Sequence, residues 1–149
     1  MTRRLSSLHA RTICHATEDC SRVEAALRTV VGEAPVARTM TEGHFGNAIE
    51  VLESSVEDEA AILDMLGRMS PGDLQEVAST LERRVDESCQ LFLRFDKQRA
   101  FAGELVLGGG EDVVAVRIKV RAFPAKREAA IAILRAVIED VASSRGARA

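Results

Sequence analysis

Three cationic side chains alternate with apolar ones in the segment VVAVRIKVR, residues 113–121. Arg117, Lys119 and Arg121 are two residues apart, the repeat of a β-strand, so they point to one side of an extended chain. Valine and isoleucine at the alternate positions predict a buried opposite side. Like charges in a row repel one another, and a bound anion would relieve that repulsion. The spacing indicates a strand face that could bind phosphates, and the alternative is an ordinary solvated face.

The next residues, FPAKR, add two more cations at the start of a helix. Pro124 suits the first helical position because its missing N–H would have no partner there, so we expect the helix to begin at Pro124. Lys126 and Arg127 would then lie in the first turn, where the helix dipole disfavours positive charge. A bound anion would reverse that preference, because free N–H groups and cationic side chains would converge on it. Lys126 and Arg127 are therefore further candidate phosphate contacts.

Three more cations lie upstream, at the end of a predicted strand over 89–95. Arg94 falls on the outer side of that strand, opposite its leucines. Lys97 and Arg99 follow in a polar loop or short helical turn, where Asp96 would pair with one of them. If the outer sides of the two strands align, Arg94, Lys97 and Arg99 widen the candidate phosphate-binding surface.

Composition limits the kinds of partner that this chain can have. Its 149 residues are 46% hydrophobic and 29% charged, as in a soluble globular protein. The net charge of −3 argues against a generally basic nucleic-acid binder, so such a role depends on a local patch. Five Phe and no Tyr or Trp make a platform that stacks single-stranded bases unexpected. No apolar run reaches the roughly 18 residues of a membrane span, and the N-terminus lacks an apolar signal core, so we expect a cytoplasmic protein without membrane contact.

Residues that often carry catalysis or bind metals occur, but not in productive patterns. Cys14, Cys20 and Cys89 form no C-x-x-C pair, and their odd number favours reduced thiols. Cys14 and His15 would point to opposite faces of a strand, so no metal site is expected. His44 lies in a glycine-flanked loop, where local hydrogen bonding is favoured over a ligand contact. No nucleophile, phosphate-loop or clustered-carboxylate motif is present, so we expect no enzyme, no catalytic residue and no cofactor.

Periodicity and capping residues predict the order strand, helix, two strands, two helices, three strands, helix. The predicted strands cover 5–16, 36–41, 48–54, 89–95, 105–107 and 113–121. The predicted helices run from a cap at Thr17 to Gly32, over 57–68, from a cap at Ser70 to 85, and over 124–143, before a frayed tail at about 144–149.

These elements predict an α+β fold in a single domain over residues 1–149. Hairpin-joined strands beside amphipathic helices indicate two layers, with an antiparallel or mixed sheet covered by helices on one face. The other face would stay open and would carry the candidate cations.

Four segments of the chain resemble a known family. They are HARTICHATED (9–19), EGHFGNAIEVLE (42–53), LFLRFDKQRAFAGEL (91–105) and VRIKVRAFPAKREAA (116–130), and their order and spacing match over about residues 8–140. The family is an archaeal group of predicted RNA-binding proteins that are often labelled exosome subunits. This chain has Ala48 and Phe123 where family members tend to have Pro and Tyr.

The resemblance implies RNA binding, a link to RNA processing or the ribosome, and a fold like the large-subunit ribosomal protein that binds 5S ribosomal RNA. Exosome or ribosome proteins are then candidate partners. Because phosphate contacts position a backbone rather than read bases, we expect structured or double-stranded RNA. The alternative is a protein-interaction subunit without direct RNA contact, whose open face, with Ile13 and Phe92, meets a partner or a second copy in a homodimer. An RNA hydrolase is a third interpretation and lacks a convergent catalytic set.

Overall fold

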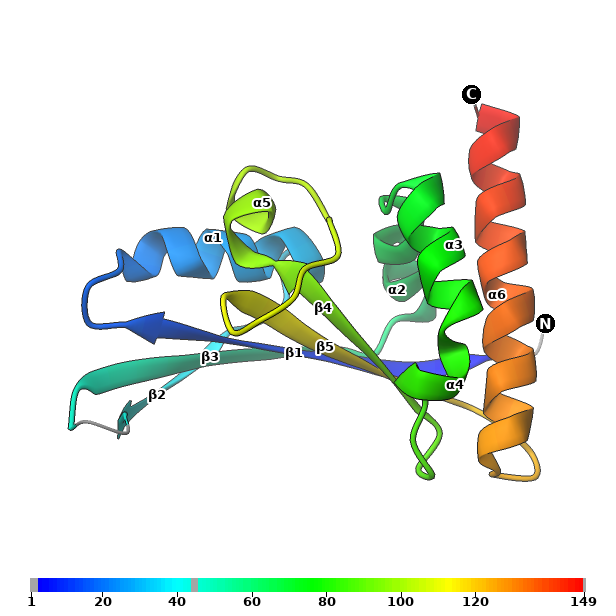
Figure 1. Cartoon of the computed structure of the whole chain (residues 1–149), viewed down its shortest axis with the longest axis horizontal. Coiled ribbons are helices and arrows are strands. Elements are labelled where there is room, and N and C mark those ends of the chain that lie inside the picture. Colours follow the sequence, from blue (N-terminus) through cyan, green and yellow to red (C-terminus); the bar gives the residue numbers. More distant parts are fainter. Residues whose placement is uncertain (1–2, 44–45, 149) are drawn as a thin grey trace. The chain divides into compact units, whose positions relative to one another are not determined.

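The computed structural model describes residues 3–43 and 46–148, with the backbone alone for 145–148 (Figure 1). His44, which the sequence singled out, lies outside the described residues. In chain order the elements are β1 (Leu5–His15), α1 (Cys20–Val31), β2 (Ala37–Glu42), β3 (Ala48–Val56), α2 (Glu59–Gly67), α3 (Pro71–Ser79), α4 (Leu81–Arg84), β4 (Gln90–Asp96), α5 (Lys97–Phe101), β5 (Val113–Val120) and α6 (Arg127–Arg148).

The strands form one sheet in the order β2-β3-β1-β5-β4. The sheet is antiparallel, and β2 and β3 pair from Ala37 opposite Glu53 to Glu42 opposite Ala48. This confirms the predicted α+β class. Strands β1, β4 and β5 largely follow the alternating pattern of the sequence, with one side apolar and buried and the other more exposed and mostly polar.

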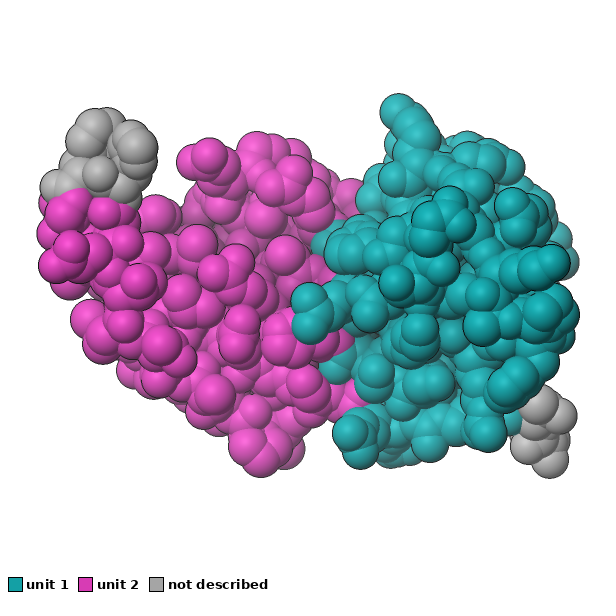
Figure 2. Space-filling view, turned by 90° about the horizontal axis from the view of Figure 1, so that it is seen from below, with its two compact units in different colours: residues 1–8, 57–93, 117–149 teal, residues 9–56, 94–116 magenta. Residues whose placement is uncertain are grey.

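The chain divides into two compact units, each built from segments that are distant in sequence (Figure 2). Unit 1 comprises residues 1–8, 57–93 and 117–149, and unit 2 comprises residues 9–56 and 94–116. Strands β1, β4 and β5 contribute residues to both units. That residues 1–149 form a single domain stays a prediction.

In unit 1, α2, α3 and α4 pack against α6 (Figure 1). The start of α3 is as predicted, because Ser70 Oγ accepts a hydrogen bond from Asp73 N and Pro71 takes the first helical position. The predicted helix from Ser70 to 85 is broken, however, into α3 and α4. The break falls at Thr80, whose backbone leaves helical geometry and whose hydroxyl donates to Glu76 O at 2.7 Å.

In unit 2, α1 and α5 pack against each other and lie on one side of the strands (Figure 1). Helix α1 is capped by Asp19, whose carboxylate accepts from Ser21 N, so the prediction of Thr17 as the cap is wrong. Thr17 belongs to the turn in which Glu18 N donates to His15 O. Gly32 ends α1 as predicted, at a φ of 65° that favours glycine.

The short strand predicted over 105–107 is reduced to a single bridge between Phe95 and Leu107. Hydrogen bonds from Asp96 N to Val106 O and from Gly108 N to Arg94 O hold this segment beside β4. The approach is close at Gly108, where a Cβ atom would lie 2.9 Å from the Asp96 backbone. Glycine is required there because no side chain fits in that space.

Candidate functional site

Strand β5 presents Arg117 and Lys119 on its outer side, as the alternation predicted. Ile118 and Val120 are buried, whereas Arg117 is exposed and Lys119 is half-buried. Arg121 follows directly after the strand and is also exposed. Side chains two residues apart on a strand lie on one face, roughly 6.6 Å from their neighbours. Arg117, Lys119 and Arg121 therefore form a row on the outer side of unit 1.

Neither this row nor Lys126 has an acidic partner among the side chains that the structure describes. Among the described side chains, no carboxylate forms an ion pair with Arg117, Lys119, Arg121 or Lys126. Lys119 Nζ donates to the backbone oxygen of Ser88, and the Arg121 guanidinium lies over the Phe123 ring, 5.8 Å from its centroid. Neither contact neutralises charge, so the row keeps its full positive charge for a partner.

The connection to α6 differs from the prediction. The helix begins at Arg127 rather than Pro124, so the predicted helix start is wrong. Lys126 N donates to Pro124 O at 2.8 Å in the turn before the helix, and Lys126 O accepts from Ala130 N in its first turn. Lys126 is exposed at that start. The helix also continues past Ser143, its predicted end.

Arg127 turns inward within unit 1. Its Nε donates to Val85 O at 2.9 Å and its Nη2 donates to Glu82 O, so the guanidinium satisfies carbonyls at the C-terminal end of α4. Arg127 therefore joins α6 to α4 through its Nε and Nη2 donors.

Lys97 is a buried cation of unit 2, with 3% of the residue exposed. Its ammonium donates to Ile13 O at 2.9 Å and lies 3.1 Å from carboxylate oxygens of both Glu18 and Asp112. Burial raises the pKa of Asp112, but hydrogen bonds from Gln98 and Lys97 outweigh that effect and leave the pKa below its ordinary value. The ammonium of Lys97 is thus fully engaged with groups of unit 2.

Arg94 and Arg99 are exposed residues of unit 2. Arg99 Nη1 lies 3.8 Å from a carboxylate oxygen of Glu104, a long and solvent-exposed ion pair. Arg94 has no carboxylate partner among the described residues. The eight candidate cations thus divide into five in unit 1 and three in unit 2.

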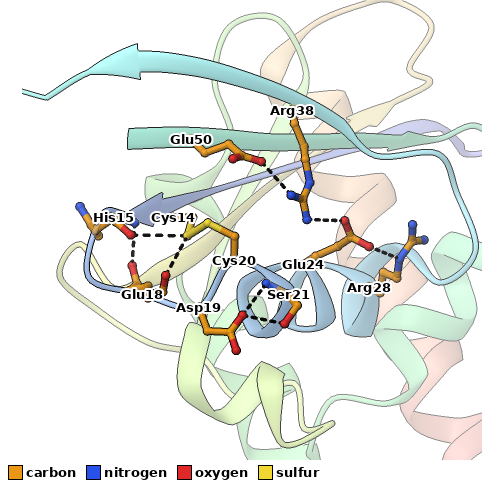
Figure 3. Close-up of polar contacts among 10 residues, drawn as sticks. All are labelled: Cys14, His15, Glu18, Asp19, Cys20, Ser21, Glu24, Arg28, Arg38 and Glu50. Carbon is orange, nitrogen blue, oxygen red and sulfur yellow. Dashed lines mark hydrogen bonds and ion pairs between the residues drawn. A yellow bond between two sulfur atoms is a disulfide. The ribbon is translucent and has the colours of Figure 1, made fainter. Parts of the chain in front are cut away.

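The other cations of unit 2 are held in ion pairs. Arg38 lies 2.8 Å from Glu24 and 3.0 Å from Glu50, and Glu24 also pairs with Arg28 at 3.2 Å (Figure 3). Hydrogen bonds from Arg38 and Arg28 lower the pKa of Glu24, and the bond to Glu24 raises the pKa of Arg38. These cations are neutralised inside the unit and offer little to an outside anion.

A half-open hollow of about 470 Å³ in unit 1 is also neutralised. Arg4 and Asp140 on its wall form an ion pair at 2.8 Å, and Arg68 lies 3.4 Å from Asp64. The hollow therefore presents paired charges.

The cysteine prediction is wrong for two of the three residues. Cys14 and Cys20 form a disulfide that joins the end of β1 to the start of α1 (Figure 3), and Cys89 is a buried free thiol. The turn after β1 brings the two Cα atoms to 5.6 Å, a geometry that cysteine spacing alone did not predict. Over the described parts of the chain, no group of three or more His, Cys, Asp or Glu could hold a metal ion.

Phe123 was not among the predicted site residues, although 80% of it is exposed. A signal was present in the sequence: Phe123 continues the outward series of Arg117, Lys119 and Arg121 at steps of two. Ala122, between Arg121 and Phe123, is buried, so the alternation extends beyond β5.

Comparisons with known proteins identify relatives of this chain. A family described as RNA binding matches residues 7–120. A Pyrococcus abyssi protein named as an RNA-binding protein is 38% identical over 143 residues, covering 89% of this chain and 93% of the relative. The structure of a DUF54 protein from Methanothermobacter thermautotrophicus superposes with a TM-score of 0.79 at 33% identity, covering 91% of this chain and 99% of that one. A DUF54 structure from Sulfolobus solfataricus, at 23% identity and a TM-score of 0.70, shares the fold over 96% and 99% of the two chains.

Membrane-spanning helices are not part of this fold as far as residues 3–43 and 46–148 show. None of their helices is both long enough and apolar enough to cross a bilayer.

Proposed function

Because the chain belongs to the RNA-binding protein family that matches residues 7–120, we propose that it binds RNA through unit 1. The contacts would be made by the outward row, which we define as Arg117, Lys119, Arg121 and Lys126. Their side chains would meet phosphate oxygens, which supply most of the affinity of proteins for nucleic acids.

One observation carries this proposal: the outward row has no carboxylate partner among the described residues. Surface cations are normally screened by nearby acids, and a row without them sets up a local positive potential. Such a potential attracts a polyanion even when the net charge of the whole chain is −3.

The proposal concerns binding without catalysis. Phosphate contacts from a strand position a backbone and respond to its shape, so structured or double-stranded RNA is the expected target. The resemblance to predicted exosome subunits supports a role in RNA processing or at the ribosome, with exosome or ribosome proteins as further partners.

The remaining predicted contacts have different weights. Arg94 and Arg99 are exposed and stay in the proposal as secondary phosphate contacts of unit 2. Lys97 is left out because it is buried and its ammonium lies 3.1 Å from two carboxylates of unit 2. Arg127 is left out because two of its donors already hold α6 to α4.

The test is a salt series of binding to an RNA hairpin with a long paired stem. In the variant Arg117→Ala/Lys119→Ala/Arg121→Ala, RNA affinity at low salt should fall at least about tenfold. A plot of the logarithm of the association constant against the logarithm of the salt concentration should have a slope that is shallower by about 2 to 3. The matched control is Arg11→Ala/Arg22→Ala/Arg38→Ala in unit 2, which removes the same charge from paired arginines that are not candidate contacts. Equal losses in both variants, or no binding by the wild type at low salt, would refute the proposal.

A second function is favoured by Phe92, a large apolar residue of β4 that is 43% exposed. An exposed aromatic side chain can anchor a protein partner, so the chain could act as an interaction subunit. Under that alternative, Phe92→Ala would weaken an association that salt scarcely affects, and the triple change at Arg117, Lys119 and Arg121 would leave it intact.

A further inference from the structure

Phe123 is the most exposed large apolar side chain among the described residues, with 80% of its surface open. It lies in the connection between β5 and α6, and its neighbours Pro124 and Ala125 are exposed as well. The Arg121 guanidinium lies over the ring at 5.8 Å from the centroid. With 80% of the residue open, a planar partner can reach the ring on the side away from Arg121.

The charged residues nearest to Phe123 in the sequence are all positive. Arg121 and Lys126 flank it, and Lys119 precedes it on β5. An apolar protein partner that covered the ring would also have to desolvate these unpaired cations, which is unfavourable. A ligand that joins a flat aromatic group to a phosphate would satisfy both features at once.

Phe101 in unit 2 provides an internal comparison. It has a similar cation–π contact, with the Arg22 guanidinium 5.4 Å from its centroid, and it is 44% exposed. It lines a hollow together with Glu18 and Asp19, whose carboxylates would repel a phosphate. The two pairs share the same ring chemistry, and the surrounding charge makes the difference.

We propose that Phe123 stacks on an unpaired base of the bound RNA, while the outward row holds the phosphates of the adjoining paired region. This inference rests on the proposed function and narrows its target to paired RNA with an unpaired nucleotide at an end or a bulge. A single exposed ring is enough for one base, because every base has a π-face and stacking needs no hydrogen-bond readout.

The experiment uses two RNA probes that share one stem. The first is a blunt hairpin, and the second carries a two-nucleotide 3′ overhang in which 2-aminopurine reports stacking by fluorescence quenching. The wild type should bind the overhang probe about tenfold more tightly than the blunt one. Phe123→Ala should abolish that difference and the quenching, Phe123→Leu should behave like Ala, and Phe123→Trp should retain both.

Stacking and charge contacts separate in the salt series. Phe123→Ala should lower affinity for the overhang probe at every salt concentration without changing the slope, because stacking releases no counterions. Phe101→Ala is the matched control and should leave both probes unaffected. Unfolding midpoints of all variants exclude misfolding as the cause.

The possible outcomes distinguish a failure of the proposed function from a failure of the stacking proposal. If the wild type binds neither probe at low salt, the proposed function fails and this inference falls with it. If binding depends on the outward row but Phe123→Ala has no effect, the stacking site alone is refuted and a protein contact explains the exposed ring. If Phe123→Ala weakens both probes equally, the ring acts on the shape of the connection and the stacking proposal is again refuted.

Discussion

In unit 2 every Lys and Arg except Arg94 lies 2.8 to 3.8 Å from a carboxylate oxygen. In unit 1, among the side chains that the structure describes, only Arg4, Arg68 and Arg135 have such a partner. The sequence of unit 2 holds seven Lys and Arg and eleven Asp and Glu, a formal charge of −4, whereas unit 1 holds thirteen and twelve, a formal charge of +1. The acidity of the whole chain therefore comes from unit 2.

The acidic residues of unit 1 are nearly as numerous as its cations, but several of their carboxylates accept hydrogen bonds from backbone N–H groups. Asp58 caps α2 by accepting from Ala60 N, and Glu59 accepts from Arg4 N and Leu5 N. Carboxylates used in this way hold the fold together without covering the outward row. From this comparison we expect pairing, rather than the number of charges, to decide which unit can meet a polyanion.

The largest expected effect comes from Lys97, the most buried cation of unit 2. In Lys97→Met the carboxylates of Glu18 and Asp112 and the Ile13 carbonyl lose a shared donor. The change should cost about 2 kcal/mol of unfolding free energy, because charged hydrogen bonds of a buried cation are lost while the Glu18 and Asp112 side chains, 23% and 57% exposed, can still reach water. Chemical denaturation measures the loss, which should be accompanied by an unchanged RNA salt slope.

Lys119→Met is the matched control for that change. Its ammonium meets one backbone oxygen on the outer side of unit 1, so stability should change little while the RNA salt slope becomes shallower by about 1. The distinction between the units would break down if Lys119→Met cost as much stability as Lys97→Met.

The second-largest expected effect concerns Glu59 of unit 1, whose carboxylate binds backbone N–H groups. The hydrogen bond from Leu5 N, then that from Arg4 N and the charges of Arg3 and Arg4, lower the pKa of Glu59 despite the opposing effect of burial. A lowered folded-state pKa means that the stabilisation is present above the ordinary value of 4.5 and disappears as pH falls through the folded-state pKa. Glu59→Gln should cost about 1 kcal/mol at pH 7, and the difference from wild type should vanish in acid.

The control for Glu59 is Glu87→Gln, a change at an exposed carboxylate of unit 1. It should leave stability unchanged at both pH values. Because backbone N–H groups supply most of the effect at Glu59, 1 M salt should reduce the cost of Glu59→Gln only slightly. If 1 M salt removed the cost, the charges of Arg3 and Arg4 would supply most of the stabilisation at Glu59. This carboxylate of unit 1 would then be held by ion pairing, as the paired carboxylates of unit 2 are.

The sequence predicted what depends on local pattern. The alternation of Arg117, Lys119 and Arg121 with apolar residues gave the correct outer side of β5, and Ser70 with Pro71 gave the correct start of α3. Lys97 shows what local pattern misses, because its partners Ile13 and Glu18 lie 84 and 79 residues away in sequence.

The predictions for the start of α6 and for the state of the cysteines were wrong for different reasons. Arg127 binds carbonyls 42 and 45 residues upstream, a long-range contact that no capping rule anticipates. The disulfide depends on how the turn after β1 is folded, which also decides that Asp19 caps α1. Phe123 was missed because few aromatic residues in the whole chain were taken as evidence against any single stacking site.

The smallest effect tests whether the paired cations of unit 2 are indifferent to RNA. Arg38→Met removes one partner each from Glu24 and Glu50, and Arg28 still pairs with Glu24. Because 42% of the Arg38 side chain is exposed, the cost should be about 0.5 kcal/mol at low salt and should disappear in 1 M salt. The pKa of Glu24, which Arg38 lowers more than Arg28 does, should move back toward its ordinary value, and NMR titration can detect this change.

The RNA affinity of Arg38→Met should stay unchanged, whereas Arg117→Met, an equal change of charge in the outward row, should weaken RNA binding. If Arg38→Met weakened RNA binding as much as Arg117→Met, net charge rather than pairing would govern binding, because only a long-range field treats the two arginines alike.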